Sequence, residues 1–319
     1  MATSKPDVVS IADLAPALPA LLARADAMKR ARRNGDLSPT RPGTNLAMVF
    51  EKSSTRTRTS FEVAMNDLGG HALYMSSRDL QLGRGETLGD TARVLSRYVD
   101  AIAYRAHHSG DVRALATGAT VPVINALDDR EHPCQIAADL LTLYERWQGA
   151  FAGRTLAYVG DGNNVLNSLL IGAGIVGLNV VAATPKAYRP PADVVASAER
   201  FAARSGAQVR LVDSPTEAAR GADALYTDVW VSMGDESEKA ERETAFQGYQ
   251  INAALVALAK PDVWVLHDLP AHRGQEITDE VIDGPRSAVW DQAENRLHAQ
   301  KAILEHVLPA GRRGHARTG

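Results

Sequence analysis

Short apolar strands alternate with helices along almost the whole chain, and this alternation constrains the fold more than any other feature. Strands are expected at residues 46–50, 71–75, 101–105 and 122–126, and then at 155–160, 179–184, 208–212, 224–230 and 264–269. Apolar strands separated by helices run parallel, because each helix carries the chain back across the sheet before the next strand begins. The pattern therefore predicts an α/β fold with two doubly wound parallel sheets.

The strand series stops and restarts near residues 136–153, which predicts two domains. A chain of 319 residues has room for two domains of about 150 residues each. We expect one domain over 1–149, completed by the C-terminal segment 291–319, and a second over 150–290. Two long helices near 135–147 and 291–307 would join them. Further helices are expected at 11–31, 60–70, 164–176 and 191–205, and after a capping box formed by Thr87 and Asp90.

Charge and cysteine content exclude several classes of protein. The chain has 35 basic and 38 acidic residues, a net charge of −3, which gives no overall attraction to nucleic acid or to an anionic membrane. A single cysteine, Cys134, excludes an intrachain disulfide and a multi-cysteine metal site. No apolar run approaches the length of a membrane span, and residues 1–10 lack a secretory pattern. We expect a soluble cytoplasmic protein.

Residues 50–58, Phe-Glu-Lys-Ser-Ser-Thr-Arg-Thr-Arg, form the densest chemical signal. They lie between a predicted strand and a predicted helix, where unpaired backbone N–H groups attract anions. Ser54, Thr55 and Thr57 add hydroxyl groups, and Arg56 and Arg58 add guanidinium groups that bind oxyanions in pairs of hydrogen bonds. This segment predicts a phosphate site. The alternative is an ordinary serine cap with solvated arginines.

Two more anchors are expected at the same edge of the sheet. Arg105 ends one strand, and His132 and Gln135 open the helix after another. Ligands of open α/β sheets collect at the carboxyl ends of the strands. A histidine in this place is a candidate ligand of the same anion, although a structural or solvated histidine remains the alternative.

Five motifs together resemble the signatures of the aspartate/ornithine carbamoyltransferase family, and most closely its ornithine carbamoyltransferase branch. They are FEKSSTRTRTSFEVAMNDLGG, HPCQIAADLLTLYE, GDGNNVLNS, DVWVSMG and HDLPAHRG. They occur in the family's order and spacing, and the resemblance runs from about residue 10 to about residue 308. It implies transfer of a carbamoyl group from carbamoyl phosphate to the side-chain amine of L-ornithine, giving L-citrulline and phosphate. This is a step of arginine biosynthesis, or of its reverse in catabolism.

The resemblance also implies a set of carbamoyl phosphate ligands. Ser54, Thr55, Arg56 and Thr57 would hold the phosphate group, and Arg105 would bridge the phosphate and the carbonyl oxygen. His132 and Gln135 would bind the carbamoyl group. Arg296, Asp268 and Leu269 would complete the ligand set. Gln81 matches a family residue that reaches into a neighbouring subunit, which implies a homo-oligomer, typically a trimer, with shared active sites.

The amine substrate would bind in the second domain. By resemblance, Asn164, which follows Asn163 in a strand-to-helix turn, would bind the amino-acid carboxylate. Asp228, Ser232 and Met233 would hold the α-ammonium end. The reaction needs a neutral amine and stabilisation of the carbonyl oxygen, and it requires no cofactor or metal.

One departure from the family pattern concerns the reacting amine. The family usually has His-Cys-Leu-Pro where this chain has His267-Asp268-Leu269-Pro270, with a cis bond expected before the proline. A carboxylate close to Asp228 would raise the pKa of at least one of the pair, and an ionised Asp268 would favour the ammonium form of the substrate. Our hypothesis is that Asp268 accepts the proton, which makes Arg105, His132, Asp228 and Asp268 the catalytic set. The alternatives are another amine substrate, or a non-catalytic protein that binds carbamoyl phosphate.

A glycine pattern from Gly172 through Gly174 to Gly177 matches the dinucleotide-binding fingerprint in spacing only. That fingerprint must follow a strand directly and open a helix. Here the glycines fall late in a predicted helix and at its end. Close helix–sheet packing and a helix C-cap explain them better than a nucleotide does.

Overall fold

The computed structural model describes residues 5–37, 39–80, 85–231 and 236–310. The chain forms two compact units, the first from residues 1–138 and 296–319 and the second from residues 139–295. The chain passes from one unit to the other within two helices, α5 (Pro133–Trp147) and α12 (Val289–Val307). No helix in the described ranges is long and apolar enough to cross a bilayer.

The first unit contains a four-stranded parallel sheet in the order β2-β1-β3-β4. Its strands are β1 (Asn45–Phe50), β2 (His71–Ser76), β3 (Ala101–Arg105) and β4 (Val123–Leu127). Its other elements are η1 (Ile11–Leu14), α1 (Leu18–Arg33), α2 (Thr55–Asp67), η2 (Ser77–Asp79), α3 (Leu88–Leu95) and α4 (Ser109–Gly118). Phe50 at the end of β1 pairs with Arg105 at the end of β3, so the two strands end side by side.

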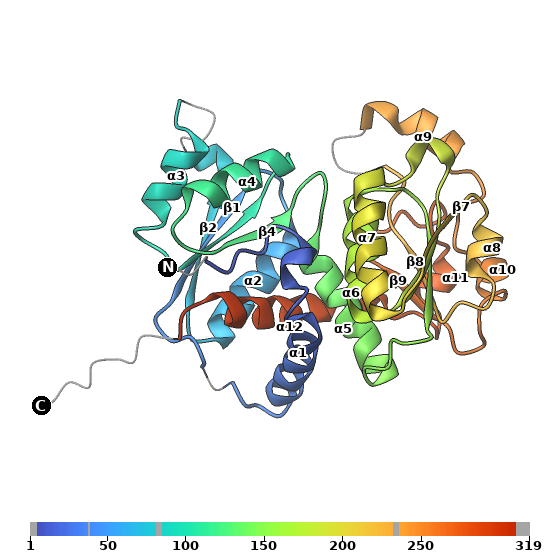
Figure 1. Cartoon of the computed structure of the whole chain (residues 1–319), viewed down its shortest axis with the longest axis horizontal. Helices are drawn as coiled ribbons and strands as arrows, with labels where there is room; N and C mark the ends of the chain where they lie inside the picture. The colour runs from blue at the N-terminus through green and yellow to red at the C-terminus, as the bar shows by residue number, and fades with distance from the viewer. Residues whose placement is uncertain (1–4, 38, 81–84, 232–235, 311–319) are drawn as a thin grey trace, which may run out of the picture. The chain divides into compact units, whose positions relative to one another are not determined.

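Helices cover both faces of this sheet (Figure 1). On one face, α3 and α4 pack Leu95 and Leu115 against Ile102 and Tyr104 of β3. On the other face, α2 contacts the sheet, and α12 is tied to α2 by an ion pair between Lys301 and Asp67 (3.1 Å). Because both faces are covered, the central strands β1 and β3 are buried along almost their whole length and are mostly apolar.

The second unit contains a five-stranded parallel sheet in the order β7-β6-β5-β8-β9. Its strands are β5 (Thr155–Val159), β6 (Asn179–Ala183), β7 (Val209–Val212), β8 (Ala224–Thr227) and β9 (Trp264–His267). Its helices are α6 (Asn164–Val176), η3 (Lys186–Tyr188), α7 (Ala192–Ser205), α8 (Pro215–Ala219), η4 (Glu236–Glu238), α9 (Lys239–Ala245), α10 (Ala253–Val256) and α11 (Asp279–Ile282). The strand order reverses beside β5, so β5 and β8 flank a switch point where α/β sheets bind ligands.

The predicted fold class is confirmed, and the glycine fingerprint is not a nucleotide loop. In Figure 1, α6 and α7 lie on one side of the second sheet and α8, α10 and α11 on the other. Gly174 lies where α6 meets α7, since a Cβ there would stand 2.8 Å from the carbonyl oxygen of Ala198. Gly177 is the left-handed C-cap of α6, as expected. The close packing is between two helices, not between helix and sheet.

Several predicted elements differ from the structure in their bounds. The helix expected over 60–70 is α2, which begins earlier, at Thr55, and ends at Asp67. The helix expected over 11–31 is split into η1 and α1, because Pro16 and Pro19 lack the N–H groups that a continuous helix needs. The strands expected over 224–230 and 264–269 end earlier, at Thr227 and His267. In both cases an aspartate follows the last paired residue at the carboxyl edge of the sheet.

Candidate active site

The first unit builds a site around the N-terminus of α2. The hydroxyl of Ser54 caps this helix by accepting the N–H of Thr57 (3.2 Å). The Thr57 side chain is buried, and its hydroxyl accepts a hydrogen bond from Nη2 of Arg296 (2.9 Å). The predicted phosphate segment therefore forms a capped helix start, and a guanidinium from the C-terminal helix reaches it.

Arg296 brings together three segments that are far apart in the sequence. It is buried, and besides Thr57 it donates from Nη1 to Oε1 of Gln135, at the start of α5. Arg105 is also buried at the end of β3. The structure thus places Thr57, Arg105, Gln135 and Arg296 at one edge of the first sheet. The sequence pattern predicted the first three there, and the family resemblance predicted Arg296.

His132 is buried among positive charges, with 3% of its surface exposed. Burial lowers the pKa of its imidazole well below the usual value, and the guanidinium groups of Arg296, Arg105 and Arg56 lower it further. The imidazole is therefore neutral at physiological pH. A neutral imidazole can donate one hydrogen bond to an oxygen atom without adding another charge to this cluster.

Two residues of the predicted motifs, Arg58 and Cys134, are not part of the anion site around His132 and Arg296. Arg58 was expected to bind the anion, but its Nε donates to Glu62 (3.0 Å) and its guanidinium lies 3.8 Å from the ring centre of Tyr74. Arg58 is exposed, on a different face of α2 from Thr57. Cys134 is buried, and burial raises the pKa of its thiol to about 12, so it is a packing residue and not a nucleophile.

Three predicted site residues cannot be located. Gln81, Ser232 and Met233 lie outside the described residues.

The second unit builds a different site at the β5–α6 turn and the ends of β8 and β9. Asn163 caps α6 with its side-chain oxygen, which accepts the N–H groups of Val165 and Leu166. Its amide nitrogen donates to Oδ2 of Asp228 (2.7 Å). Asn164 is the first residue of α6 and is half-buried. Asn163 and Asp228, which are 65 residues apart, are therefore held together by one side-chain amide.

Asp228 and Asp268 meet at this edge together with His267. One ligand atom from each of the three side chains lies within 4.8 Å of the other two. The expected close approach of the two carboxylates is therefore present. The expected cis bond between Leu269 and Pro270 is also present, and Leu269 has a positive φ of 64°.

Both ring nitrogens of His267 are already used. Nδ1 accepts the N–H of Leu269 (2.9 Å), so the ring proton is on Nε2, which lies 3.1 Å from Oε1 of Glu276. A metal ion would bind His267 only by displacing one of these hydrogen bonds. The donor set therefore fits a histidine fixed by two hydrogen bonds, which shapes the turn at Asp268, better than it fits a metal centre.

Sequence reasoning missed Glu276 and the pairing of Asp161 with Arg242. Glu276 is fully buried and lies nine residues beyond His267 in an irregular segment, where no periodicity marks it. Arg242 of α9 donates to Oδ2 of Asp161 (2.9 Å) and to the carbonyl oxygen of Trp230 (3.2 Å). The sequence signal for this ion pair was an aspartate at position 161, within the GDGNN motif directly after a predicted strand.

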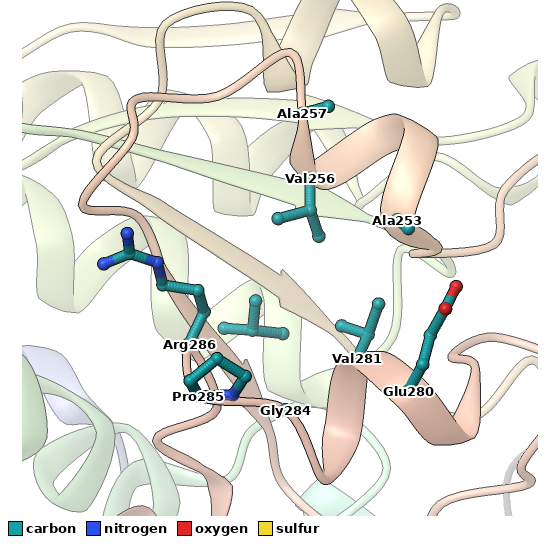
Figure 2. A pocket seen from close by; sticks show the side chains of 9 residues that line it. Ala253, Val256, Ala257, Glu280, Val281, Gly284, Pro285 and Arg286 are labelled. Carbon is teal, nitrogen blue, oxygen red and sulfur yellow. The ribbon is translucent and has the colours of Figure 1, made fainter.

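A separate hollow of about 280 Å³ lies elsewhere in the second unit, between α10 and α11. Figure 2 shows Val256 and Val281 facing into it, with Glu280 and Arg286 on opposite sides. Apart from Glu280 and Arg286 its lining is apolar, and it includes none of the predicted site residues. Its chemistry does not suit a small, highly charged substrate.

Both units match known protein families over nearly their whole length. Residues 7–145 match the carbamoyl-P binding domain of aspartate/ornithine carbamoyltransferase, and residues 152–307 match its Asp/Orn binding domain. The chain is 52% identical over 308 residues to an ornithine carbamoyltransferase of Methanoculleus marisnigri, covering 96% of this chain and 98% of that protein. It is 57% identical over 266 residues to the anabolic ornithine carbamoyltransferase of Pyrococcus furiosus, covering 83% and 84% of the two chains.

Solved structures of ornithine carbamoyltransferases have the same fold as this chain. The structure of ornithine carbamoyltransferase from Pyrococcus furiosus superposes with a TM-score of 0.91 at 52% identity, covering 96% of this chain and 97% of that one. Ornithine transcarbamoylase from Giardia lamblia superposes with a TM-score of 0.87 at 33% identity, covering 97% of this chain and 100% of that one.

Proposed function

The chain belongs to the aspartate/ornithine carbamoyltransferase family, and from this premise we propose that it transfers the carbamoyl group of carbamoyl phosphate to the side-chain amine of L-ornithine. The products are L-citrulline and phosphate. The observation that carries the proposal is the buried Arg296, which donates to Thr57 at the capped start of α2 and to Gln135 at the start of α5, at the sheet edge where Arg105 and His132 are also buried. This arrangement suits a doubly charged phosphate joined to a neutral carbonyl.

The first unit is the carbamoyl phosphate domain in this proposal. Ser54, Thr55, Arg56 and Thr57 bind the phosphate oxygens through the N–H groups, hydroxyls and guanidinium at the start of α2. Arg296, which already bonds to Thr57, brings a further positive charge. The ionic part of the ligand is thereby matched by fixed cations, so little reorganisation is needed when it binds.

The carbonyl oxygen of the carbamoyl group gains negative charge as the amine attacks. Arg105 and His132 donate to this oxygen, and the carbonyl oxygen of Gln135 accepts an N–H of the carbamoyl amide. A neutral His132 remains a donor throughout the reaction. Phosphate is a good leaving group, so positioning of the two reactants supplies much of the rate enhancement.

The second unit is the ornithine domain. Asn164 binds the α-carboxylate, and Asp228 with Ser232 and Met233 binds the α-ammonium group. Asp268, which stands where the family usually has cysteine, accepts the proton that the reacting amine must lose. His267 fixes the turn that carries Asp268, because its Nδ1 accepts the N–H of Leu269. Asp268 and Leu269 also contribute to carbamoyl phosphate binding in this proposal.

We propose the biosynthetic direction and a homotrimer with Gln81 shared between subunits. The printed name of the Pyrococcus furiosus relative, anabolic ornithine carbamoyltransferase, supports the direction. Exposed apolar side chains in the first unit support assembly, because edge strand β2 exposes Leu73, helix α3 exposes Val94 and the turn after α3 exposes Tyr98. Light scattering would measure the mass. Mixed trimers of Gln81→Ala and Arg105→Met chains would regain activity if the sites are shared.

A citrulline assay with carbamoyl phosphate tests the function. L-ornithine, putrescine, L-lysine and N-acetylornithine would be compared at pH 7 and pH 9. We expect turnover with ornithine, faster at pH 9 because an alkyl amine with a pKa of about 10.4 is more often neutral there. Turnover with another amine alone would reassign the acceptor. Binding of phosphate without turnover of any amine would contradict catalysis.

A further inference from the structure

Tyr158 has a buried hydroxyl that the reaction described above does not use. The side chain is 0% exposed, and among the described residues its hydroxyl has no hydrogen-bond partner. Its neighbour Tyr226, whose ring centre is 5.8 Å away, is also buried, but that hydroxyl donates to Asp139 (2.7 Å). A buried hydroxyl without a partner is unfavourable, because it has given up water and gained nothing in return. A bound ligand could therefore supply the hydrogen bond that the hydroxyl of Tyr158 lacks, whereas the hydroxyl of Tyr226 already has its hydrogen bond to Asp139.

The hydroxyl of Tyr158 lies at the ligand-binding edge of the second sheet. A Cβ placed on Gly160, which follows β5, would stand 3.6 Å from this hydroxyl and 3.4 Å from Oγ1 of Thr227. Thr227 immediately precedes Asp228. The phenol thus ends beside the first residues after β5 and β8, which flank the switch point of the sheet.

Four carboxylates of the second unit act electrostatically on this hydroxyl. The four that raise the pKa of Tyr158 beyond the effect of burial are, in decreasing order, Asp228, Asp161, Asp268 and Glu276. Asp161 is paired with Arg242, and Glu276 is hydrogen-bonded to His267. Asp228 is 4% exposed, and no cation pairs with it in the part of the chain that the structure describes. A buried carboxylate without a cation and a buried hydroxyl without a partner stand together.

We propose that Tyr158 binds the α-ammonium group of the amino-acid substrate, with its hydroxyl oxygen accepting one N–H while Asp228 accepts another. An ammonium group has three donors and no acceptor, and it supplies both the missing charge and the missing hydrogen bond. This inference rests on the proposed function and adds a residue to its amino-acid pocket. Amines without a charged α-ammonium group, such as N-acetylornithine and 5-aminopentanoate, would leave the buried pair unsatisfied.

The variant Tyr158→Phe tests the proposal, because it removes one oxygen and keeps the ring. We expect the KM for L-ornithine to rise about tenfold, since a hydrogen bond to a charged group is lost, with kcat within twofold of wild type. L-Norvaline has the α-amino acid group of ornithine but no reacting amine, and its inhibition constant should rise by the same factor. The KM for carbamoyl phosphate should not change. The unfolding midpoint of the unliganded variant should be equal or higher, since no protein hydrogen bond is lost.

Tyr249→Phe is the matched control. Its hydroxyl already donates to the carbonyl oxygen of Asp213 (2.6 Å), so this variant should lose some stability and keep the wild-type KM for ornithine. An unchanged norvaline constant in Tyr158→Phe would overturn the proposal. So would a fall in kcat at unchanged norvaline binding, which would place the hydroxyl at the reacting amine. Inactive wild-type protein would refute the proposed function itself, whereas active wild type with an unaffected variant would refute only the role of Tyr158.

Discussion

The two sheet edges of this protein share one architecture and have opposite charge. In each unit a strand leads into a capped helix, α2 after Ser54 and α6 after Asn163. At the first edge three guanidinium groups act on His132, whereas at the second edge four carboxylates act on Tyr158. Each helix N-terminus offers the same partial positive charge. The side chains around the helix start therefore decide which ligand each edge can bind.

The caps themselves show how the difference arises. Ser54 uses its hydroxyl on one backbone N–H and adds no further group. Asn163 uses its oxygen on the helix and its nitrogen on Asp228, so the same side chain that caps α6 also holds an acid at the edge. A serine cap leaves the helix N-terminus available to an anion, and an asparagine cap of this kind places a carboxylate beside it.

For the positively charged sheet edge of the first unit, the variant with the largest expected effect is Arg105→Met. We expect kcat to fall about 10³-fold, because a donor to the developing oxyanion is lost. The citrulline assay at saturating substrates measures it. Arg113→Met, an exposed arginine on α4, is the control and should retain wild-type activity. A loss below tenfold in Arg105→Met would show that the charge of this edge serves binding and not catalysis.

For the negatively charged sheet edge of the second unit, the corresponding variant is Asp268→Asn. We expect kcat to fall about 10²-fold at pH 7, as for loss of a proton acceptor, and less at pH 9, where more amine is already neutral. The pH profile of kcat measures this. Asp268→Cys restores the residue usual in the family. Higher activity of that variant with unchanged substrate preference would contradict a required carboxylate base.

The third test uses the depressed pKa of His132, which only the positive edge produces. The folded pKa lies below the unfolded value of about 6.5, so on acidification the unfolded chain binds the proton first. The stability that His132 contributes is thus complete at higher pH and is lost as the pH falls below about 6.5. Relative to His132→Gln, wild type should lose up to about 1.4 kcal/mol per pH unit there.

Urea unfolding at pH 7.5 and pH 5.5 measures this difference. His71→Gln removes an exposed histidine from the same unit and should leave the pH dependence of wild type unchanged. Parallel pH profiles of wild type and His132→Gln would show that His132 is not held neutral by its neighbours.

The smallest expected effect separates two arginines of one motif. Arg56→Gln should raise the KM for carbamoyl phosphate about tenfold, as expected for a lost charged hydrogen bond. Arg58→Gln should change it less than twofold and destabilise the fold by at most about 1 kcal/mol, since its partner Glu62 is a surface neighbour. Equal effects of the two substitutions on the KM for carbamoyl phosphate would show that Arg58 also binds this substrate.

Most of the fold could be predicted from the sequence. The assignment of Arg58 to the anion site was an error that helix geometry would have prevented. Strand and helix alternation predicted both parallel sheets, because apolar periodicity is a local signal. Arg56 and Arg58 are two residues apart on a helix, so they point to different sides, and only one can face the site. Counting arginines in the motif without this geometry assigned both to the anion.

Other residues could not be predicted, because their partners are distant. Tyr158 was one apolar strand residue among many until folding placed its hydroxyl near Asp228, 70 residues away. The role of Glu276 depends on its hydrogen bond with His267, and the orientation of His267 depends in turn on its hydrogen bond with the N–H of Leu269. Arg296 was expected only through family resemblance, since no local pattern predicts that a C-terminal helix returns to Thr57.

That return of α12 sets the order in which the protein can be completed on the ribosome. Residues 139–295 are synthesised as an uninterrupted stretch, whereas the first unit also needs residues of α12 from Arg296 onwards, which are synthesised after that stretch. Domains usually fold from the N-terminus onwards during synthesis. Here Lys301 can reach Asp67, and Arg296 can reach Thr57, only after residues 139–295 have been synthesised. A nascent chain stopped before α12 would contain the STRTR motif and still lack a finished anion pocket.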